Sequence, residues 1–219
     1  MLLVLDTSGG SFSAGILGGD GAPYAALEVH GGQTHSLLLP SAIDALLETL
    51  ECQQAALRGI VFVNGPGSFT GLRVGGSFVK GLAFNSPLKI YCISRLAALL
   101  FAYRDFPLPL LVLSDARKGE LHCRGLNIPE LENDCLLSPE AVLGKIPTDT
   151  YVLGEIPERY RDTFTQAKRV KYLPLPPLGF WAGRCIQLTP DYPETPLSHI
   201  ELLYMRKSEA EVAREERGK

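Results

Sequence analysis

Asn-Gly-Pro-Gly-Ser-Phe-Thr-Gly-Leu-Arg-Val-Gly-Gly, residues 64–76, joins an apolar segment to a helix through a glycine-rich turn. The preceding run, Gly59–Val63, is β-branched and aromatic, which is typical of a strand covered on both faces. Pro66 fixes φ in the turn, while Gly65 and Gly67 supply torsions that other residues avoid. The sequence therefore predicts a buried strand that passes directly into a tight turn.

The helix after this turn should begin at Ser68 or Thr70, because either side-chain oxygen can accept an unpaired backbone N–H, and it should run to about Phe84. An exposed helix N-terminus attracts anions, and Arg73 in the first turn would add positive charge. The junction can therefore hold either a phosphate or another protein.

Neither standard phosphate motif fits the turn. A P-loop needs lysine and then serine or threonine after its last glycine, but Leu72-Arg73 follows Gly71. The dinucleotide fingerprint would place Thr70 where the third glycine belongs, and no acidic residue follows at the required spacing. The glycines could also serve tight geometry alone.

Four glycines lie inside or beside the helix, at positions 71, 75, 76 and 81. Each interior glycine costs about 1 kcal/mol relative to alanine, so close backbone approach is expected in return. One helix face combines small with large residues: Gly71, Gly75, Phe78 and Leu82. Such a face is suited to receive another helix.

A second helix is predicted from His35 to about Leu50. Its apolar stripe has helical spacing and consists of Leu39, Ile43, Leu46, Leu47 and Leu50. Leu38, Ala42 and Ala45 widen the apolar surface beyond what one core face requires. The helix is either buried within a larger fold or carries a docking face, and the pattern leaves both open.

Composition indicates an ordinary globular chain of 219 residues, with 46% hydrophobic and 21% charged residues. A net charge of −3 gives no basic footprint, so strong independent binding to nucleic acid is not expected. Five separated cysteines without a Cys-x-x-Cys pair favour reduced thiols and a cytoplasmic location. No secretory segment or membrane span is expected, because Asp6 follows the first apolar residues too soon and later apolar runs are short.

No catalytic constellation emerges from the sequence. His30 and His35 lack the spacing of zinc ligands on one helix face, and His122 and His199 have no clustered partners, so no metal site is expected. Ser68 lacks the spacing of a nucleophile elbow.

The predicted element order up to about residue 103 is βββαβαβα, which is the ribonuclease-H-like lobe from which actin, sugar kinases and Hsp70 are built in duplicate. The expected elements after the first hairpin include a strand at Lys89–Ile93 and a helix at Ser94–Tyr103. A second hairpin, with a turn at 115–120, echoes the first. The fold class is therefore α/β with two such lobes.

Acidic turn residues near the hairpins are the nucleotide candidates of this fold by analogy: Asp6, Thr7 and Ser8 in the first lobe, and Asp115 in the second. The same residues are also ordinary turn formers, and Asp115 could serve as a turn cap or as an ion-pair partner of Arg117. Both readings stay open.

The pattern decays after Asn127, where prolines divide the chain into short elements, so the second lobe is expected to be reduced. The predicted division is an N-terminal lobe at 1–104, a reduced C-terminal lobe at 105–206 and a charged tail at 207–219. The chain is short for an actin-like enzyme with an adenosine pocket of its own.

Several segments resemble the TsaB (YeaZ) family of small bacterial paralogues of TsaD. They are residues 3–8, His35 with 38–40, the run Gly65-Pro66-Gly67-Ser68-Phe69-Thr70-Gly71-Leu72-Arg73, Ser94, residues 115–120, and Tyr204-Met205-Arg206. The segment from Glu130 to Pro196 shows little likeness, and Leu202 stands where the family often has proline.

The resemblance implies a noncatalytic subunit of the complex that makes N6-threonylcarbamoyladenosine (t6A) at position 37 of tRNA. The implied partners are a TsaD-like catalytic subunit and a TsaE-like ATPase, with ATP used by the complex, tRNA met only through it, and a homodimer possible in isolation. The helices starting at His35 and Phe69 would then form the partner interface through Leu39, Ile43, Leu46, Leu47, Gly71, Gly75, Phe78 and Leu82.

Two other functions remain as alternatives. One is a nucleotide-binding ATPase of the actin-like fold that acts on its own and uses Asp6. The other is a peptidase, which historical naming of the wider family suggests and the absence of paired metal ligands disfavours.

Overall fold

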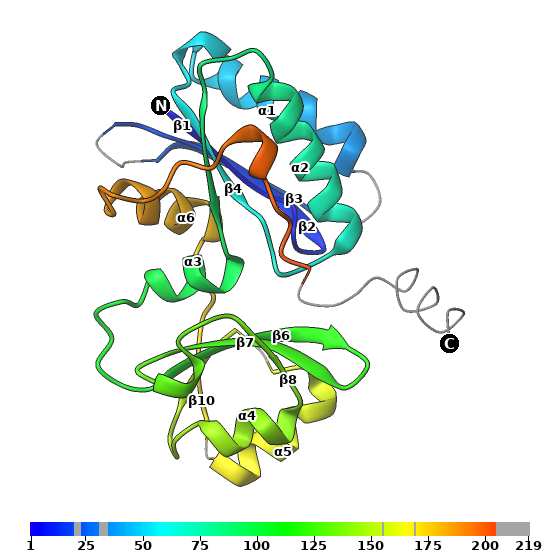
Figure 1. Cartoon of the computed structure of the whole chain (residues 1–219), viewed down its shortest axis with the longest axis vertical. Coiled ribbons are helices and arrows are strands. Elements are labelled where there is room, and N and C mark those ends of the chain that lie inside the picture. Colours follow the sequence, from blue (N-terminus) through cyan, green and yellow to red (C-terminus); the bar gives the residue numbers. More distant parts are fainter. Residues whose placement is uncertain (20–22, 31–34, 155, 169, 205–219) are drawn as a thin grey trace. The chain divides into compact units, whose positions relative to one another are not determined.

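The computed structural model describes residues 1–19, 23–30, 35–154, 156–168 and 170–204. Two compact units divide the chain, and each is described here by itself (Figure 1). The first contains Met1–Arg104 together with Leu175–Leu202, and the second contains Asp105–Pro174 and, at the end of the described residues, Leu203 and Tyr204. The sequence also predicts a turn at 18–21 for the first hairpin, and part of this turn and all of the predicted tail at 207–219 lie outside the described residues.

The first unit is built on a five-stranded mixed sheet in the order β3-β2-β1-β4-β5. Its strands are β1 (Leu2–Asp6), β2 (Ser11–Leu17), β3 (Pro23–His30), β4 (Gly59–Val63) and β5 (Lys89–Ile93). β1 pairs antiparallel with β2 and parallel with β4. All five residues of β4 are buried, which confirms the prediction of a strand covered on both faces.

Helices cover both faces of this sheet (Figure 1). They are α1 (His35–Thr49), α2 (Phe69–Ala83), α3 (Arg95–Phe101) and α6 (Leu178–Gln187), with short turns η1 (Gln54–Ala56) and η3 (Leu197–His199). Side chains alternate along the strands, so Leu3, Leu5 and Phe62 pack with α1 and α2. Val4 and Val61 point the other way and pack with α3 and α6.

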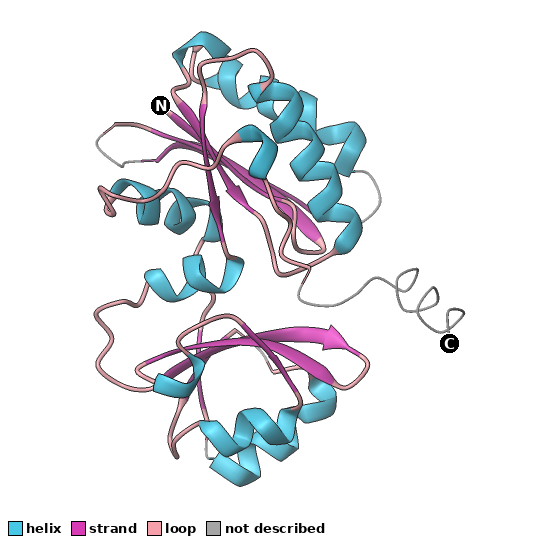
Figure 2. Ribbon diagram, in the orientation of Figure 1, coloured by secondary structure: helices cyan, strands magenta, loops and turns pink. Residues whose placement is uncertain are grey.

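The second unit has its own five-stranded sheet, in the order β10-β9-β6-β7-β8. The strands are β6 (Leu110–Arg117), β7 (Glu120–Leu126), β8 (Cys135–Leu137), β9 (Tyr151–Leu153) and β10 (Lys171–Leu173). The turn η2 (Pro129–Leu131) and the helices α4 (Pro139–Lys145) and α5 (Glu158–Lys168) complete this unit (Figure 2). Val142 of α4 and Phe164 of α5 share one core with Leu111 and Val152 of the sheet.

The two sheets have the same topology. In each, the first strand lies in the middle, the second and third follow on one side, and the fourth and fifth lie on the other side. Three strands of the second sheet have only three residues each. The predicted α/β fold of two ribonuclease-H-like lobes, the second of them reduced, is confirmed.

The boundaries of the units differ from the predicted division at residue 206. Residues 175–202 belong to the first unit, although they follow the last strand of the second sheet. The physical reason is α6, whose Ala182, Cys185 and Ile186 fill the apolar face of the first sheet beside Val4. A helix that the chain order assigns to the second repeat thus completes the core of the first.

The second hairpin also differs from its predicted form, because β6 continues through Asp115 to Arg117. The turn is therefore shorter than the predicted span 115–120. Arg117, Lys118 and Gly119 have φ values of 64°, 47° and 88°, which place the reversal of the chain at these residues.

Candidate functional site

The end of β1 carries a network of polar side chains. Asp6 is 4% exposed, and its Oδ2 accepts a hydrogen bond from Arg95 Nη1 at 2.6 Å. Its Oδ1 accepts from the backbone N–H of Ser8 at 2.8 Å and from the Ser8 hydroxyl. Arg95 Nη1 also lies 2.9 Å from Ser8 Oγ. Both carboxylate oxygens are therefore occupied by protein donors.

The start of α2 packs directly on the same turn. The Ser68 backbone N–H donates to the Ser8 carbonyl at 2.7 Å, and Ser68 Oγ caps the helix by accepting from the Gly71 N–H. The predicted start of the helix is confirmed. A Cβ at Gly67 would lie 2.2 Å from Ser8 O, and one at Gly71 would lie 2.0 Å from Thr7 O. These two glycines are needed for close approach of two backbones.

This packing bears on the nucleotide candidates of the first lobe. A phosphate beside Asp6 would need free donors and space, but the N–H of the N-cap residue Ser68 donates to the Ser8 carbonyl, Ser68 Oγ accepts from the Gly71 N–H, and Gly67 and Gly71 lie in close contact with this turn. The Thr7 hydroxyl is buried against Gly75, where a Cβ would lie 2.2 Å from it. Asp6, Thr7 and Ser8 thus form a structural joint between β1 and α2.

Asp115 has a structural role of the same kind in the second unit. It caps the turn by accepting from the Arg117 N–H at 2.7 Å, and it forms an ion pair with Arg159 of α5. The turn-cap reading is thus confirmed, while the ion-pair partner is Arg159 instead of the expected Arg117.

Two observations describe the ionisable groups in the part of the chain that the structure describes. No group of three or more His, Cys, Asp or Glu residues there could hold a metal ion. His122 is 8% exposed and lies with Nδ1 3.4 Å from Ser114 Oγ. Burial lowers the pKa of His122, against the smaller upward effects of Asp134, Asp115 and Glu120.

The α1 residues predicted for a partner interface lie in the core instead. Leu39, Ile43, Leu46 and Leu47 are between 1% and 7% exposed and pack with the sheet. The reason is the width of the sheet, because α1 packs on both β2 and β3 and uses its broad apolar stripe for that purpose. These four side chains therefore serve mainly the core of the first unit, although Ile43 and Leu47 also reach the groove between α1 and α2.

Two of the predicted interface glycines are also used inside the chain. Gly71 and Gly75 face the end of β1, and a Cβ at Gly75 would also lie 2.9 Å from Phe62. Gly76 makes room for Leu202, which a Cβ would approach to 3.1 Å. Packing within the chain therefore explains why α2 carries Gly71, Gly75 and Gly76 in spite of their low helix propensity.

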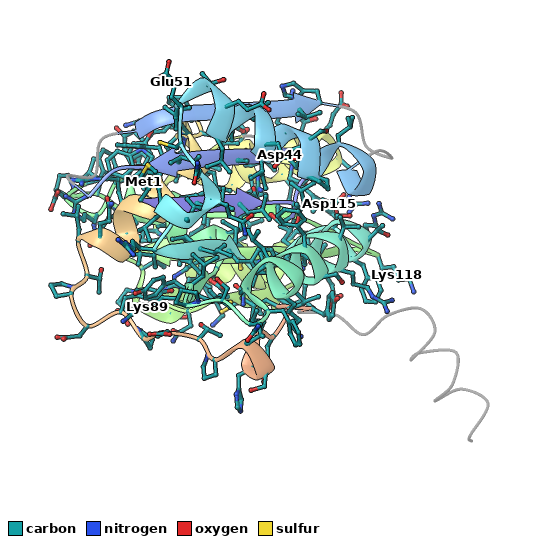
Figure 3. The ribbon with its side chains drawn as sticks, turned by 90° about the horizontal axis from the view of Figure 1, so that it is seen from above. Met1, Asp44, Glu51, Lys89, Asp115 and Lys118 are labelled. Carbon is teal, nitrogen blue, oxygen red and sulfur yellow. The ribbon has the colours of Figure 1, made fainter. Side chains whose placement is uncertain are left out.

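Phe78 and Leu82 remain at the surface as partly buried residues. With part of α1 and η1 they line a groove of about 140 Å³, whose full lining is Pro40, Ile43, Asp44, Leu47, Gln54, Leu57, Phe78 and Leu82. Asp44, labelled in Figure 3, is the one carboxylate of this lining. The structure thus keeps an apolar groove between α1 and α2, and four of the predicted interface residues line it: Ile43, Leu47, Phe78 and Leu82.

The outer side of α2 continues this surface. Thr70, Ser77 and Gly81 are exposed, and Val74 is partly buried. Their spacing of four, three and four residues places them on one line along the helix. Leu38 of α1 and Phe69 of α2 are each 40% exposed. We call the groove and this line together the α1–α2 outer surface.

The signature loop at 64–73 is fixed by neighbours that the sequence pattern did not mark. Arg95 donates its backbone N–H to Gly65 O at 2.6 Å, and Asn64 Nδ2 donates to Glu201 O at 2.9 Å. Arg73, expected beside an anion, lies with its guanidinium 5.3 Å from the Phe69 ring centroid. Arg95 directly follows Ser94, the predicted start of α3. This position in the first turn of a helix was the one feature of the sequence that could have drawn attention to Arg95.

Comparison with known proteins identifies the family of this chain. Residues 29–145, more than half of the chain, match the family model described as TsaD: tRNA N6-adenosine threonylcarbamoyltransferase. The chain is 30% identical over 121 residues to the tRNA threonylcarbamoyladenosine biosynthesis protein TsaB of Bacillus subtilis, covering 55% of this chain and 52% of that protein. The chain belongs to the TsaB (YeaZ) family.

A second TsaB protein, from Haemophilus influenzae, is 32% identical over 127 residues, covering 55% of this chain and 51% of that protein. The matched region spans about half the length of these curated relatives. YeaZ from Pseudomonas aeruginosa has the same fold as this TsaB-family chain, with a TM-score of 0.70 at 23% identity over 93% of this chain and 98% of that chain. A Pseudomonas aeruginosa structure described as an uncharacterized protein with similarity to peptidase YEAZ gives 0.73 at 24% identity, covering 94% and 99%.

Proposed function

We propose that this TsaB-family chain is a noncatalytic scaffold subunit of the complex that makes t6A at position 37 of tRNA, where it binds and activates a TsaD-like catalytic subunit. Membership of the family and the names of the two curated relatives support this pathway. A TsaE-like ATPase completes the proposed complex, and tRNA meets the chain only within it.

The observation that carries the proposal is the α1–α2 outer surface. It keeps an apolar groove although the core of the first unit is already filled. The line from Thr70 to Gly81 consists of small side chains, which allow a second helix to approach closely. A helical surface of a TsaD-like protein is the partner that this shape suits.

The network at the end of β1 supports a noncatalytic role. Asp6, Ser8 and Arg95 satisfy one another, so the acidic residue expected beside a phosphate is committed to the fold. An ATPase that works through Asp6 would need this joint to open.

Gly81 offers a test that leaves the fold intact, because a Cβ there meets no heavy atom within 4 Å. Gly81→Arg places a long side chain on the α1–α2 outer surface, at the end of the line and next in sequence to Leu82 of the groove. Gly144→Arg is the matched control, since Gly144 also lies in a helix with nothing within 4 Å of its Cβ. Gly75→Leu would be unsuitable, because its side chain would clash with Thr7 and Phe62 inside the chain.

Copurification with a TsaD-like subunit and t6A formation by the reconstituted complex are the measurements. We expect Gly81→Arg to lose both by at least tenfold, while Gly144→Arg retains them and both variants keep the thermal unfolding temperature of the parent. Modification that proceeds equally well without this chain would refute the activating role. Unchanged complex formation by Gly81→Arg would instead refute the assigned surface.

The isolated chain should self-associate through the same surface, since it is apolar and unpaired in one copy. Sedimentation should therefore show Gly81→Arg as a monomer at concentrations where the parent and Gly144→Arg form dimers. A dimer that persists in Gly81→Arg would mean that another face is used.

A further inference from the structure

Two cysteines of the second unit face each other across paired strands. In the antiparallel pairing of β7 with β8, Cys123 and Cys135 are direct partners. Directly opposed residues point to the same face of a sheet, with Cβ atoms about 4.5–5.5 Å apart. Cys123 belongs to the apolar core of this unit, and Cys135 packs against that core. Both thiols are free.

The neighbouring residue pair holds the two strands in this register. Arg124 and Asp134, which follow and precede the two cysteines, form an ion pair of 3.1 Å on the opposite face of the sheet. A slip of β8 by one residue would break this ion pair and turn Cys135 away from Cys123. The opposition of the cysteines is thus a fixed feature of the fold.

We infer that Cys123 and Cys135 form a reversible cross-strand disulfide, which makes this sheet edge a site of oxidative modification by peroxides. A disulfide needs Cβ atoms about 3.5–4.5 Å apart, so the strands must approach by about 1 Å. β8 can move this far because it is a three-residue edge strand with a neighbour on one side only.

The two thiols differ in accessibility, and this difference sets the order of the chemistry. Cys123 is fully buried, whereas Cys135 is partly exposed. Burial raises the pKa of the Cys123 thiol to about 12, with smaller upward effects of Cys135 and Asp134. Cys123 therefore stays protonated at neutral pH, and Cys135 is the thiol that meets the oxidant. Its Sγ now donates to Asn133 O at 3.2 Å, so its side chain must rotate before the bond forms.

The reaction balances with hydrogen peroxide as the oxidant. The Cys135 thiolate attacks one peroxide oxygen, the O–O bond breaks, and the departing hydroxide takes up the released proton as water, leaving a sulfenic acid. The Cys123 sulfur then attacks the sulfenic sulfur, the S–O bond breaks, and the Cys123 proton leaves with hydroxide as a second water. Two thiols are oxidised and one peroxide is reduced to two waters.

Peptide mapping of the full chain tests the inference directly. Trypsin places Cys123 in the peptide Gly119–Arg124 and Cys135 in the peptide Gly125–Lys145, and neither contains another cysteine. After mild peroxide treatment and alkylation in denaturant, we expect these two peptides to appear linked. Alkylatable thiols should fall from five to three, and dithiothreitol should restore five.

Variants separate this pair from the other cysteines. Cys135→Ser should abolish the linked peptides, whereas Cys52→Ser, a half-buried control in the first unit, should keep them. The oxidised parent should unfold about 5–10 °C above the reduced one, because the bond closes a loop in the unfolded chain. Five alkylatable thiols after oxidation, a Cys135 that stops at sulfinic acid, or linkage of either cysteine to a different one would overturn the inference.

Discussion

Asp6 and Arg95 form the ion pair on which the end of β1 depends. The Asp6 side chain is 6% exposed and that of Arg95 is 25% exposed, so water replaces little of the interaction if one partner is lost. This pair fixes the turn that α2 and the signature loop pack against.

Arg95→Met should destabilise the chain by about 3 kcal/mol, because it leaves the buried Asp6 carboxylate without its cation. The double variant Asp6→Asn/Arg95→Met should recover part of this loss, since it removes the buried charge as well. Urea unfolding of the single and double variants at pH 7 measures both values. Equal stability of the single variant and the parent would show that the pair contributes nothing.

His122 should make stability depend on pH in the mildly acidic range. Burial lowers its pKa in the folded chain below the ordinary value of 6.5, so the unfolded chain binds its proton first as the pH falls. The His122 contribution is therefore complete above pH 6.5 and is lost as the pH drops toward the lowered pKa. Unfolding free energies between pH 7.5 and 5 should fall less steeply for His122→Gln than for the parent. Parallel curves would exclude His122 as the group responsible.

At the scale of single elements, α2 shows why a helix can carry glycines for opposite reasons. Gly71 permits contact between α2 and the backbone of Thr7, whereas nothing lies near Gly81. The two glycines look alike in the sequence, and only their neighbours in the folded chain distinguish a glycine that is required from one that is not.

Alanine at these two positions should change stability in opposite directions. Gly71→Ala should cost about 3 kcal/mol or more, because its Cβ would overlap a backbone carbonyl that cannot move independently. Gly81→Ala should add up to about 1 kcal/mol through helix propensity alone. Thermal and urea unfolding of both variants provide the comparison. A stable Gly71→Ala chain would mean that the joint between α2 and β1 can open.

The sequence predicted the regular elements of the first unit well, because each had a strong local signal. β5 was predicted at its observed bounds, and α1 and α2 within about one residue at each end. The burial of α1 was predicted less well, since its apolar stripe looks the same whether it meets a wide sheet or another protein. The pairing of Arg95 with Asp6 across 89 residues could not be predicted, because the position of Arg95 after Ser94 marks only the start of α3.

At the scale of the whole chain, the strands and helices of the second repeat after Asn127 could not be predicted in detail, because most of its strands are too short. β8, β9 and β10 have three residues each, and a period of two cannot be recognised over that length. The return of α6 to the first unit was missed for another reason, since chain order alone assigns it to the second repeat.

Because α6 packs in the first unit, a substitution in α6 should destabilise the strands of the first sheet. Gly183 of α6 lies so close to β1 and β2 that a Cβ would be 2.9 Å from both Val4 and Leu17. Gly183→Val should therefore destabilise the chain by about 1–3 kcal/mol through overpacking. Hydrogen exchange should report the loss of protection in residues 2–17, although the change lies after the last strand of the second sheet.

Gly144→Val in α4 is the control, because a Cβ at position 144 meets nothing within 4 Å. If Gly183→Val instead increased exchange at residues 110–126 and spared 2–17, α6 would belong with the second sheet. Each core would then be formed only by residues of its own repeat, in the order of the chain.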